Sequence, residues 1–396
     1  MNRVAYLNCE LKSRDLESRL LIASHLLKSG IAVVVGQVWA LVRNAQARKN
    51  TPGIYLFTTA NSSQAKGMNW AKEAGHLVIA SDEEALPLVD PLKNVTLEAI
   101  SLSDKFLVDT EAHKAMLVGQ FNAAEKFFVT GSARLEAIRS AETPIIPGRP
   151  YILFNTGFGV INSLWGSPQT ALAIMRQAIQ LTEEEAQSII DVENASIDIV
   201  LQLIRWLAPD HRVVIRPHPS ERAQMWREMF PQVDVVESSL PLPWIKSAKV
   251  LIHCNSTTGL EAAFVGTPTL NLNPIPAYGA QYIIGKINRT VETVQAAKKE
   301  LTAFLHDETD LSGSISPDEL FTPNGARNTA RAILELIGEG TSLPNDFPWA
   351  PVARDPHQRV KFSASREEIV RSPSLSSAPY TAIHELDDSV FLLVPT

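Results

Sequence analysis

The stretch "KVLIHCNSTTGLEAAFVGTPTLNL", residues 249–272, decides the fold class of this chain. It begins with an apolar run and a polar cluster, then continues through a helical segment and Gly266 into a second apolar run. A strand, a helix and a second strand in this order are typical of a βαβ unit with parallel strands. Similar apolar runs recur at residues 3–9, 31–36, 53–57, 76–81, 126–131, 151–155, 212–217 and 233–237. The sequence therefore predicts an α/β protein built on parallel sheets.

The length of 396 residues favours two domains over one. A proline-rich stretch at 140–150 is typical of a linker between the two domains. We predict an N-terminal domain at 1–145, a C-terminal domain at 146–340, and a tail at 341–396. The tail sequence is proline-rich and aperiodic, so we expect it to lie over the surface or to be partly disordered. Two domains of this kind predict a central cleft, where ligands usually bind.

The bulk composition excludes several classes of protein. Net charge is −7 and charged residues make up 20% of the chain, which argues against nucleic-acid binding. The longest apolar stretch, residues 31–42, is interrupted by Gly36 and Gln37 and is shorter than the roughly 20 residues that span a bilayer. The two cysteines, Cys9 and Cys254, fit buried thiols in a reducing compartment, and the first residues do not resemble a signal peptide. We predict a cytoplasmic protein without a transmembrane helix.

The motif "RPHPSE", residues 216–221, lies where a predicted strand ends and a helix begins. Ligands of open α/β sheets collect at such strand ends, where helix N-termini also bind anions. Arg216 can supply a positive charge, His218 can donate to a phosphate oxygen, and Pro219 limits how far the loop can flex. The alternative is a rigid turn with a surface histidine.

The polar cluster inside residues 249–272 lies at a second strand end. The cluster consists of Asn255, Ser256, Thr257 and Thr258. Its amide and hydroxyl donors would form a phosphate cradle, and Gly259 would permit close approach of the phosphate. Glu261, one turn into the helix, could accept hydroxyl groups of a ribose or a base. The alternatives are an ordinary N-cap and a first-turn acid favoured by the helix dipole.

"RPHP" followed by "NSTTGLEA" (255–262) resembles the histidine-proline and serine-serine/threonine motifs of GT-B glycosyltransferases that use CMP-activated acidic sugars. The stretch "CELKSRDLESRLLIASHLLKSGIAVVVG" (9–36) is similar to the opening of bacterial surface-carbohydrate biosynthesis proteins, which include retaining Kdo transferases. "VTGSARLEAI" (129–138) resembles that group's Gly-Asn-Pro-Arg-type segment, from which Ser132 and Ala133 depart. "ILFNTGFG" (152–159) resembles an Asn-Thr-Asn-Phe-type segment, from which Gly157 departs.

The resemblance implies a GT-B-like fold of two Rossmann-like domains that face a central cleft. It implies that the C-terminal domain holds a CMP-sugar and that the N-terminal domain binds a glycan or glycolipid acceptor. A monophosphate leaving group needs less charge neutralisation than a diphosphate, and no Asp-x-Asp motif is present, so we expect neither a metal nor another cofactor. An acidic sugar needs a cation near its carboxylate, for which Lys12, Arg14 and Arg19 are candidates. The alternative for these three is an exposed helix start with an Arg14–Glu17 pair.

The catalytic carboxylate has three candidates. "SDEEA" (81–85) follows a predicted strand and resembles an Asp/Glu-Asp/Glu-Gly motif that supplies an acid or base in related enzymes, although Ala85 replaces the glycine. A carboxylate here could deprotonate the acceptor or attack the anomeric carbon. We predict that Asp82, Glu83 or Glu10 fills this role, and Glu83 is preferred. The alternative for the acidic run is a helix N-terminus enriched in acids.

These observations predict a metal-independent transferase that moves Kdo or a related ulosonic acid from CMP to a surface-polysaccharide acceptor. Two alternatives remain open: a GT-B-like enzyme that uses another nucleotide, such as a UDP-sugar epimerase-like or polyol-phosphate transferase enzyme, and a non-catalytic assembly protein with this fold. The sequence does not decide between retention and inversion, nor does it give the oligomeric state. It also leaves open peripheral association with the inner membrane.

Overall fold

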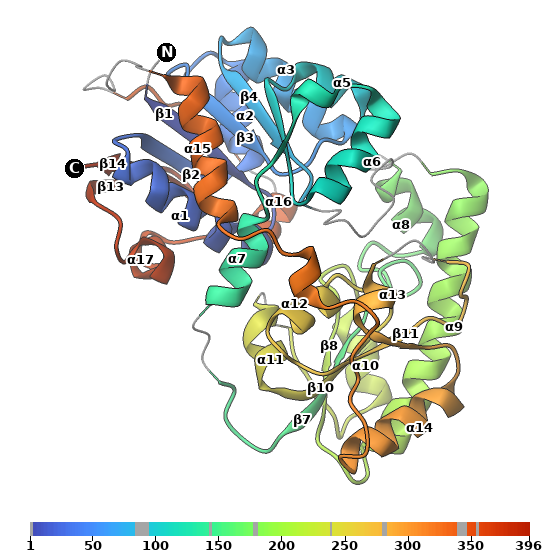
Figure 1. The fold of residues 1–396 in the computed structure, drawn as a ribbon. Coiled ribbons are helices and arrows are strands. Elements are labelled where there is room, and N and C mark those ends of the chain that lie inside the picture. The colour runs from blue at the N-terminus through green and yellow to red at the C-terminus, as the bar shows by residue number, and fades with distance from the viewer. Residues whose placement is uncertain are drawn as a thin grey trace. The chain divides into compact units, whose positions relative to one another are not determined.

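The computed structural model describes residues 3–83, 95–141, 145–176, 181–237, 240–278, 283–338, 347–353 and 356–396. The chain divides into two compact α/β units (Figure 1). Among the described residues, unit 1 takes in 3–83, 95–141 and 321–396, and unit 2 takes in 145–320. Unit 1 is therefore built from two separate parts of the chain, between which unit 2 is inserted.

The sheet of unit 1 has the strand order β13-β14-β2-β1-β3-β4-β5-β6. Its strands from the N-terminal part pair in parallel: β1 (Val4–Cys9), β2 (Ala32–Gln37), β3 (Ile54–Phe57), β4 (Leu77–Ser81), β5 (Lys105–Val108) and β6 (Phe127–Val129). One face is covered by α1 (Lys12–Lys28), α7 (Ala133–Ser140) and α15 (Gly325–Ile337). The other face is covered by α2 (Val38–Gln46), α3 (Ser62–Glu73), α5 (Leu97–Leu102) and α6 (Glu111–Phe121).

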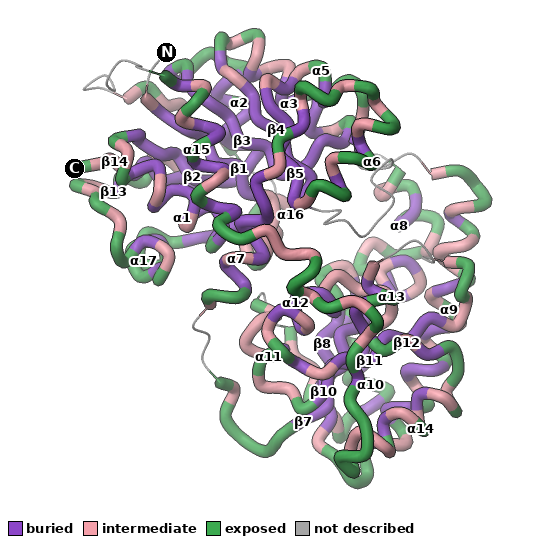
Figure 2. The backbone as a smooth tube through the Cα atoms, in the orientation of Figure 1, coloured by how far each residue is buried: buried purple, intermediate pink, exposed green. Residues whose placement is uncertain are grey.

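Helices on both faces explain why the strands of unit 1 are apolar throughout. All six residues of β1 are buried, and Figure 2 shows the same for the neighbouring strands. Ala5 and Leu7 pack into the cluster beneath α1, whereas Val4 and Tyr6 pack into the cluster beneath α2 and α3. A strand that is covered on both faces has a continuous run of apolar residues, and the strands of unit 1 show such runs.

The predicted tail is wrong, because the chain returns to unit 1 after residue 320. Helix α15 carries Ala326, Ala330, Ile333 and Ile337 on one face, and this face packs against the core beneath α1 and α7. Short helices α16 (Pro356–Lys361) and α17 (Arg366–Arg371) follow. The hairpin β13 (Tyr380–Asp387) and β14 (Val390–Pro395) then joins the sheet, with β14 antiparallel to β2. Residues 390–393 are buried because β14 is flanked by a strand on each side.

Unit 2 contains a parallel sheet of order β12-β11-β10-β7-β8-β9. Its strands are β7 (Tyr151–Asn155), β8 (Val213–Arg216), β9 (Asp234–Val235), β10 (Ala248–His253), β11 (Thr269–Leu272) and β12 (Arg289–Val291). Its helices are α8 (Pro168–Met175), α9 (Glu183–Leu207), α10 (Ala223–Met229), α11 (Pro241–Ser247), α12 (Thr258–Phe264), α13 (Ile284–Ile287) and α14 (Val294–Leu305). The largest apolar cluster of this unit lies between the sheet and α9, α10 and α14.

In each unit the carboxyl ends of parallel strands bring polar residues that are distant in sequence to one edge of the sheet. Within the described residues, no helix has both the length and the apolar character needed to cross a membrane.

Candidate functional site

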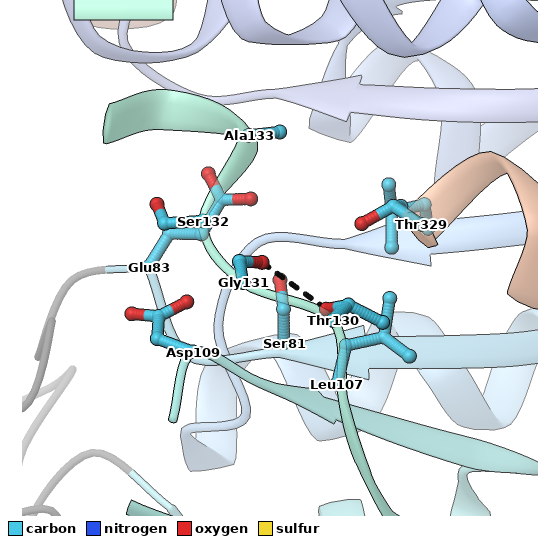
Figure 3. Close-up of a pocket in the computed structure, with 10 residues that line it drawn as sticks. Ser81, Glu83, Leu107, Asp109, Thr130, Gly131, Ser132, Ala133 and Thr329 are labelled. Carbon is cyan, nitrogen blue, oxygen red and sulfur yellow. Dashed lines mark hydrogen bonds between the residues drawn. The ribbon is translucent and has the colours of Figure 1, made fainter. Parts of the chain in front are cut away.

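The carboxyl ends of β4, β5 and β6 meet at a small polar hollow in unit 1, lined by Glu83, Asp109 and residues 130–133 (Figure 3). The backbone N–H of Glu83 donates to the Thr58 carbonyl at 2.9 Å, which fixes the residue beyond the end of β4. Gly131 has φ +81°, and a Cβ there would lie 2.4 Å from the Thr322 carbonyl oxygen. Only glycine therefore fits the turn that carries the chain from β6 into α7.

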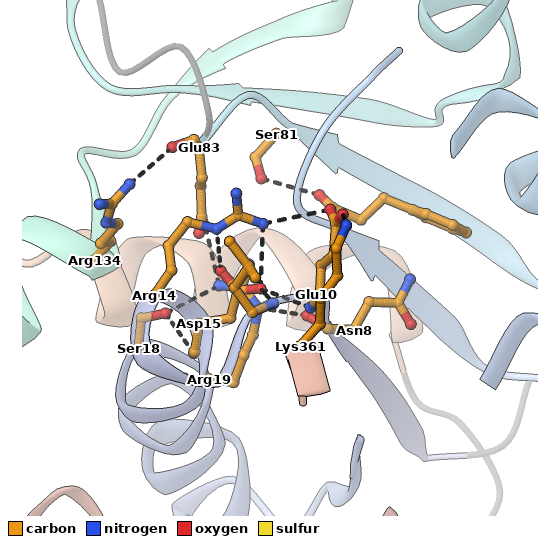
Figure 4. A network of polar contacts seen from close by, with 12 residues as sticks. Asn8, Glu10, Arg14, Asp15, Ser18, Arg19, Ser81, Glu83, Arg134 and Lys361 are labelled. Carbon is orange, nitrogen blue, oxygen red and sulfur yellow. Dashed lines mark hydrogen bonds and ion pairs between the residues drawn. The ribbon is translucent and has the colours of Figure 1, made fainter. Parts of the chain in front are cut away.

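A buried arginine faces the Glu83 carboxylate (Figure 4). Arg19, on α1, is completely buried; its Nη1 donates to Glu83 Oε1 at 3.0 Å and its Nε donates to the Asn8 carbonyl at 3.1 Å. Arg134 Nη1 donates to the Glu83 carbonyl at 3.3 Å. Glu83 Oε2 has no hydrogen-bond partner among the described residues. The ion pair thus compensates the buried charge of Glu83 and leaves one of its oxygens available for chemistry.

Asp109 follows β5 directly and is the acid that sequence reasoning missed. Burial, followed by the charges of Glu83 and Asp82, raises its pKa to about 8, while Arg134 acts in the opposite direction. Asp109 therefore carries a proton at neutral pH, beside a carboxylate that is paired with arginine. An acid whose pKa is moved to near neutral pH by burial and by a second acid is a group that acid–base catalysis can use.

Of the three predicted carboxylates, Glu83 lines the hollow, and Asp82, buried next to it in sequence, acts on Asp109 through its charge. Glu10 is partly exposed; its carboxylate accepts from Lys361 Nζ at 3.2 Å and lies 3.5 Å from Arg14 Nη2. Glu10 is not among the residues that line the hollow. The rest of the predicted acidic motif, Glu84 and Ala85, lies outside the described residues.

The three predicted cations each contact a different acid. Lys12 Nζ pairs with Glu368 at 2.5 Å, Arg14 Nε with Asp15 at 2.6 Å, and Arg19 with Glu83. Glu17, the partner in the alternative Arg14–Glu17 pair, accepts from the hydroxyls of Ser372 and Ser374. Asp15 is occupied further by the backbone N–H groups of Glu10 and Leu11. Arg19 pairs with Glu83, a residue that lines the hollow.

In unit 2, the "RPHPSE" loop is organised by its last residue. The buried carboxylate of Glu221 accepts hydrogen bonds from the Thr156 hydroxyl, the backbone N–H groups of Phe158 and His218, and the side chains of Asn162 and Trp226. Glu221 therefore ties the loop after β8 to the loop after β7, and it holds the backbone at His218 in place.

Arg216 and His218, the other predicted ligand-binding residues of this loop, differ in burial. Arg216 is the buried last residue of β8; burial lowers the pKa of its guanidinium, and the charge of Glu261 on α12 opposes that shift. His218 is exposed, and its Nδ1 accepts from the Ser220 backbone N–H at 3.2 Å. In the neutral ring the proton then lies on Nε2, which can donate to a ligand.

The polar cluster after β10 combines fixed and accessible groups. Asn255 has φ +47° and is held by Asn271 and Asn273: its backbone N–H donates to Asn271 Oδ1 at 2.7 Å, and its amide contacts both side chains. The Ser256 and Thr258 hydroxyls lie 2.9 Å apart, and Thr257 makes no side-chain capping bond. The role expected for Gly259 needs correction. A Cβ there would lie 2.3 Å from His253 Nε2, so the glycine is required by packing within the unit.

Comparison with solved structures shows the class of fold. The UDP-GlcNAc 2-epimerase of Methanocaldococcus jannaschii superposes with a TM-score of 0.52 at 11% sequence identity and covers 85% of this chain and 100% of its own. The Neisseria meningitidis UDP-GlcNAc 2-epimerase, solved with UDP-GlcNAc, gives 0.51 at 12% identity, with coverage of 85% and 99%. The chain therefore has a GT-B-like α/β fold, which confirms the predicted fold class. No protein-family model matches the chain, and no curated protein matches it by sequence.

Proposed function

We propose that the protein is an enzyme that acts on a nucleotide-activated sugar, with nucleotide binding assigned to unit 2 and acid–base chemistry assigned to unit 1. The observation that carries this proposal is the set of groups at the carboxyl edge of the unit 2 sheet. Arg216 supplies charge for a phosphate, His218 Nε2 and the 256–258 hydroxyls supply donors, and Glu261 supplies an acceptor for hydroxyl groups. The likeness to UDP-GlcNAc 2-epimerases supports the same ligand class at the level of fold.

Within this class we favour a CMP-activated acidic sugar, such as Kdo or a related ulosonic acid, as donor for a glycan or glycolipid acceptor. The support is the joint occurrence of "RPHP" and "NSTTGLEA" and the similarity of residues 9–36 to surface-carbohydrate biosynthesis proteins. Among the three predicted cations, Arg19 is paired with Glu83 of the hollow. Lys12, Arg14 and Arg19 are the cations that we assign to recognition of the donor carboxylate.

The test is a thermal-shift comparison of CMP, UDP, GDP and ADP in the presence of a chelator, because a ligand that binds only the folded state raises its melting temperature. We expect CMP to give the largest shift. Release of CMP from CMP-Kdo in the presence of acceptor would then demonstrate transfer. A response restricted to a nucleoside diphosphate with magnesium would contradict both the CMP assignment and the expected independence from metal.

A second candidate, a UDP-sugar epimerase, is favoured by the Asp109 and Glu83 pair. Inverting the configuration at a carbon that carries a hydrogen requires a base to remove a proton and an acid to deliver one, and burial together with the charges of Glu83 and Asp82 raises the pKa of Asp109 to about 8. Incubation with UDP-GlcNAc in D2O separates the candidates. Incorporation of deuterium into the sugar, followed by NMR, would favour the epimerase, whereas unchanged UDP-GlcNAc together with CMP-Kdo turnover would favour the transferase.

A further inference from the structure

A row of polar side chains crosses the unit 2 sheet at its carboxyl edge. The strand register places five residues in successive pairs on adjacent strands: Thr290 with Asn271, Asn271 with His253, His253 with Asn155, and Asn155 with Arg216. In-register residues of neighbouring parallel strands point to the same face of the sheet. The five side chains therefore form one line across β12, β11, β10, β7 and β8.

Four members of this row have partners. Asn271 Nδ2 donates to Thr290 Oγ1 at 3.2 Å, His253 Nδ1 accepts from the Ser256 backbone N–H at 3.1 Å, and Arg216 interacts with the charge of Glu261. Asn155 is different. It is only 3% exposed, and neither its amide oxygen nor its amide nitrogen has a hydrogen-bond partner within the described residues. A buried amide in this condition destabilises the folded state and calls for an explanation.

The position of Asn155 indicates what it faces. It shares a face of β7 with Tyr151 and Leu153, which pack with Ala262 of α12. Asn155 lies on the same face, beyond the apolar cluster. Its neighbours on the adjacent strands are Arg216 at the end of β8 and His253 at the end of β10, which leads into residues 254–258. Residues 254–258 and Ser220 are only partly buried, and His218 is exposed. The loops that follow the strands on either side of Asn155 are therefore accessible to a ligand.

We infer that the amide of Asn155 donates a hydrogen bond to a phosphate oxygen of the nucleotide, next to the positive charge of Arg216. This inference rests on the proposed function and adds a phosphate-binding residue to it. An amide suits this place because its nitrogen donates to an anionic oxygen, whereas a carboxylate of the same shape would repel it.

Asn8 supplies a matched control. It lies in the first strand of unit 1 as Asn155 lies in the first strand of unit 2, it is fully buried, and both atoms of its amide lack partners within the described residues. Asn8, however, shares its face with Val4 and Tyr6, which pack into an apolar and aromatic cluster. The two asparagines therefore have the same unpaired amide but different neighbours on the adjacent strands, because Asn155 is in register with Arg216 and His253 whereas Asn8 is in register with Gly36.

The experiment measures calorimetric binding of CMP and cytidine, in parallel with UDP and uridine, to the wild type and to Asn155→Leu, Asn155→Asp and Asn8→Leu. We expect Asn155→Leu to weaken binding of the nucleotide about 10-fold or more, the scale of one hydrogen bond to a charged group, and to leave nucleoside affinity within about twofold. Asn155→Asp should weaken nucleotide binding further. Asn8→Leu should leave both affinities unchanged.

Melting temperatures provide the second readout. Asn155→Leu should raise the melting temperature of the unliganded protein by about 2–6 °C, because an unpaired buried amide is removed. If the leucine variant does not fold, Asn155→Ala replaces it. An unchanged ratio of nucleotide to nucleoside affinity in a folded Asn155 variant would overturn the assignment of Asn155 alone. Absence of CMP and UDP binding by the wild type would overturn the proposed function as well.

Discussion

The carboxyl edges of the two sheets differ in the kind of polar group they carry. In unit 1 the edge is dominated by ionisable side chains: Glu83 pairs with Arg19 and acts on Asp109 through its charge, which links two strand ends and a helix. In unit 2 it consists mainly of amides and hydroxyls, and Arg216 is the cation in its polar row. Ionisable groups with different proton affinities can move protons, whereas neutral donors can bind an anion without a change of charge. The same α/β scaffold thus supports two kinds of chemistry.

The largest expected effect is a separation of turnover from binding in unit 1. Glu83→Gln keeps the shape of the side chain and removes the charge that faces Arg19, so we expect turnover to fall by about 10²–10⁴-fold, the range for loss of a general acid or base. Nucleotide affinity should persist. Asp82→Asn and Glu10→Gln complete the comparison, and we expect the smallest loss for Glu10→Gln, because Glu10 does not line the hollow. Full activity in all three variants would remove the catalytic role from this edge.

A somewhat smaller effect is expected in unit 2. His218→Ala removes a donor that points from a loop fixed by Glu221, and we expect turnover to fall by about 10²-fold, as for loss of one preorganised donor. The fold should be unaffected because the ring is exposed. Circular dichroism and steady-state rates test this expectation. Equal rates in mutant and wild type would show that His218 has only a structural role in the turn. The two sheet edges would then differ more clearly in their contribution to turnover.

The third prediction concerns pH. The folded-state pKa of Asp109, about 8, lies above its ordinary value of 3.8. Its contribution to stability is therefore complete below about pH 4 and is lost as the pH rises through about 8. Asparagine has no such dependence, so Asp109→Asn should gain melting temperature relative to the wild type between pH 5 and pH 9. The rate of the wild type should also fall above about pH 8, where the acid loses its proton. A constant difference in melting temperature would show that Asp109 is not protonated in the folded state.

The smallest expected effect concerns Lys12. Its ion pair with Glu368 is largely solvent-exposed on the Glu368 side, and such pairs contribute about 0–1 kcal/mol. Lys12→Ala should therefore change the free energy of unfolding by less than about 1 kcal/mol and should leave nucleotide affinity unchanged. Chemical denaturation measures the first quantity. A large loss of donor affinity would restore the predicted role of Lys12 at the donor carboxylate.

The sequence predicted the strands that combine a long apolar run with clear flanking turns, such as β1, β2, β7 and β10. It missed β5, whose short apolar run is flanked by Asp104 and Lys105 on one side and by Asp109 on the other, and with it Asp109 at the strand end. It also missed β13 and β14, because the proline-rich sequence before them led to the whole of 341–396 being predicted as a tail, including the apolar residues 390–393. The function of Glu221 was not predictable either. Its donors at 156–162 are distant in sequence, and only the parallel pairing of β7 with β8 brings them together.

The return of the chain to unit 1 has a consequence for synthesis on the ribosome. The described residues of unit 2 lie between 145 and 320, whereas in unit 1 β2 pairs Val33 with Leu393. Contacts across so long a stretch of chain form late, since the loop they close is large. The first unit to be translated is therefore the last to finish folding, and until then β2 presents an unpaired apolar edge that a chaperone can recognise.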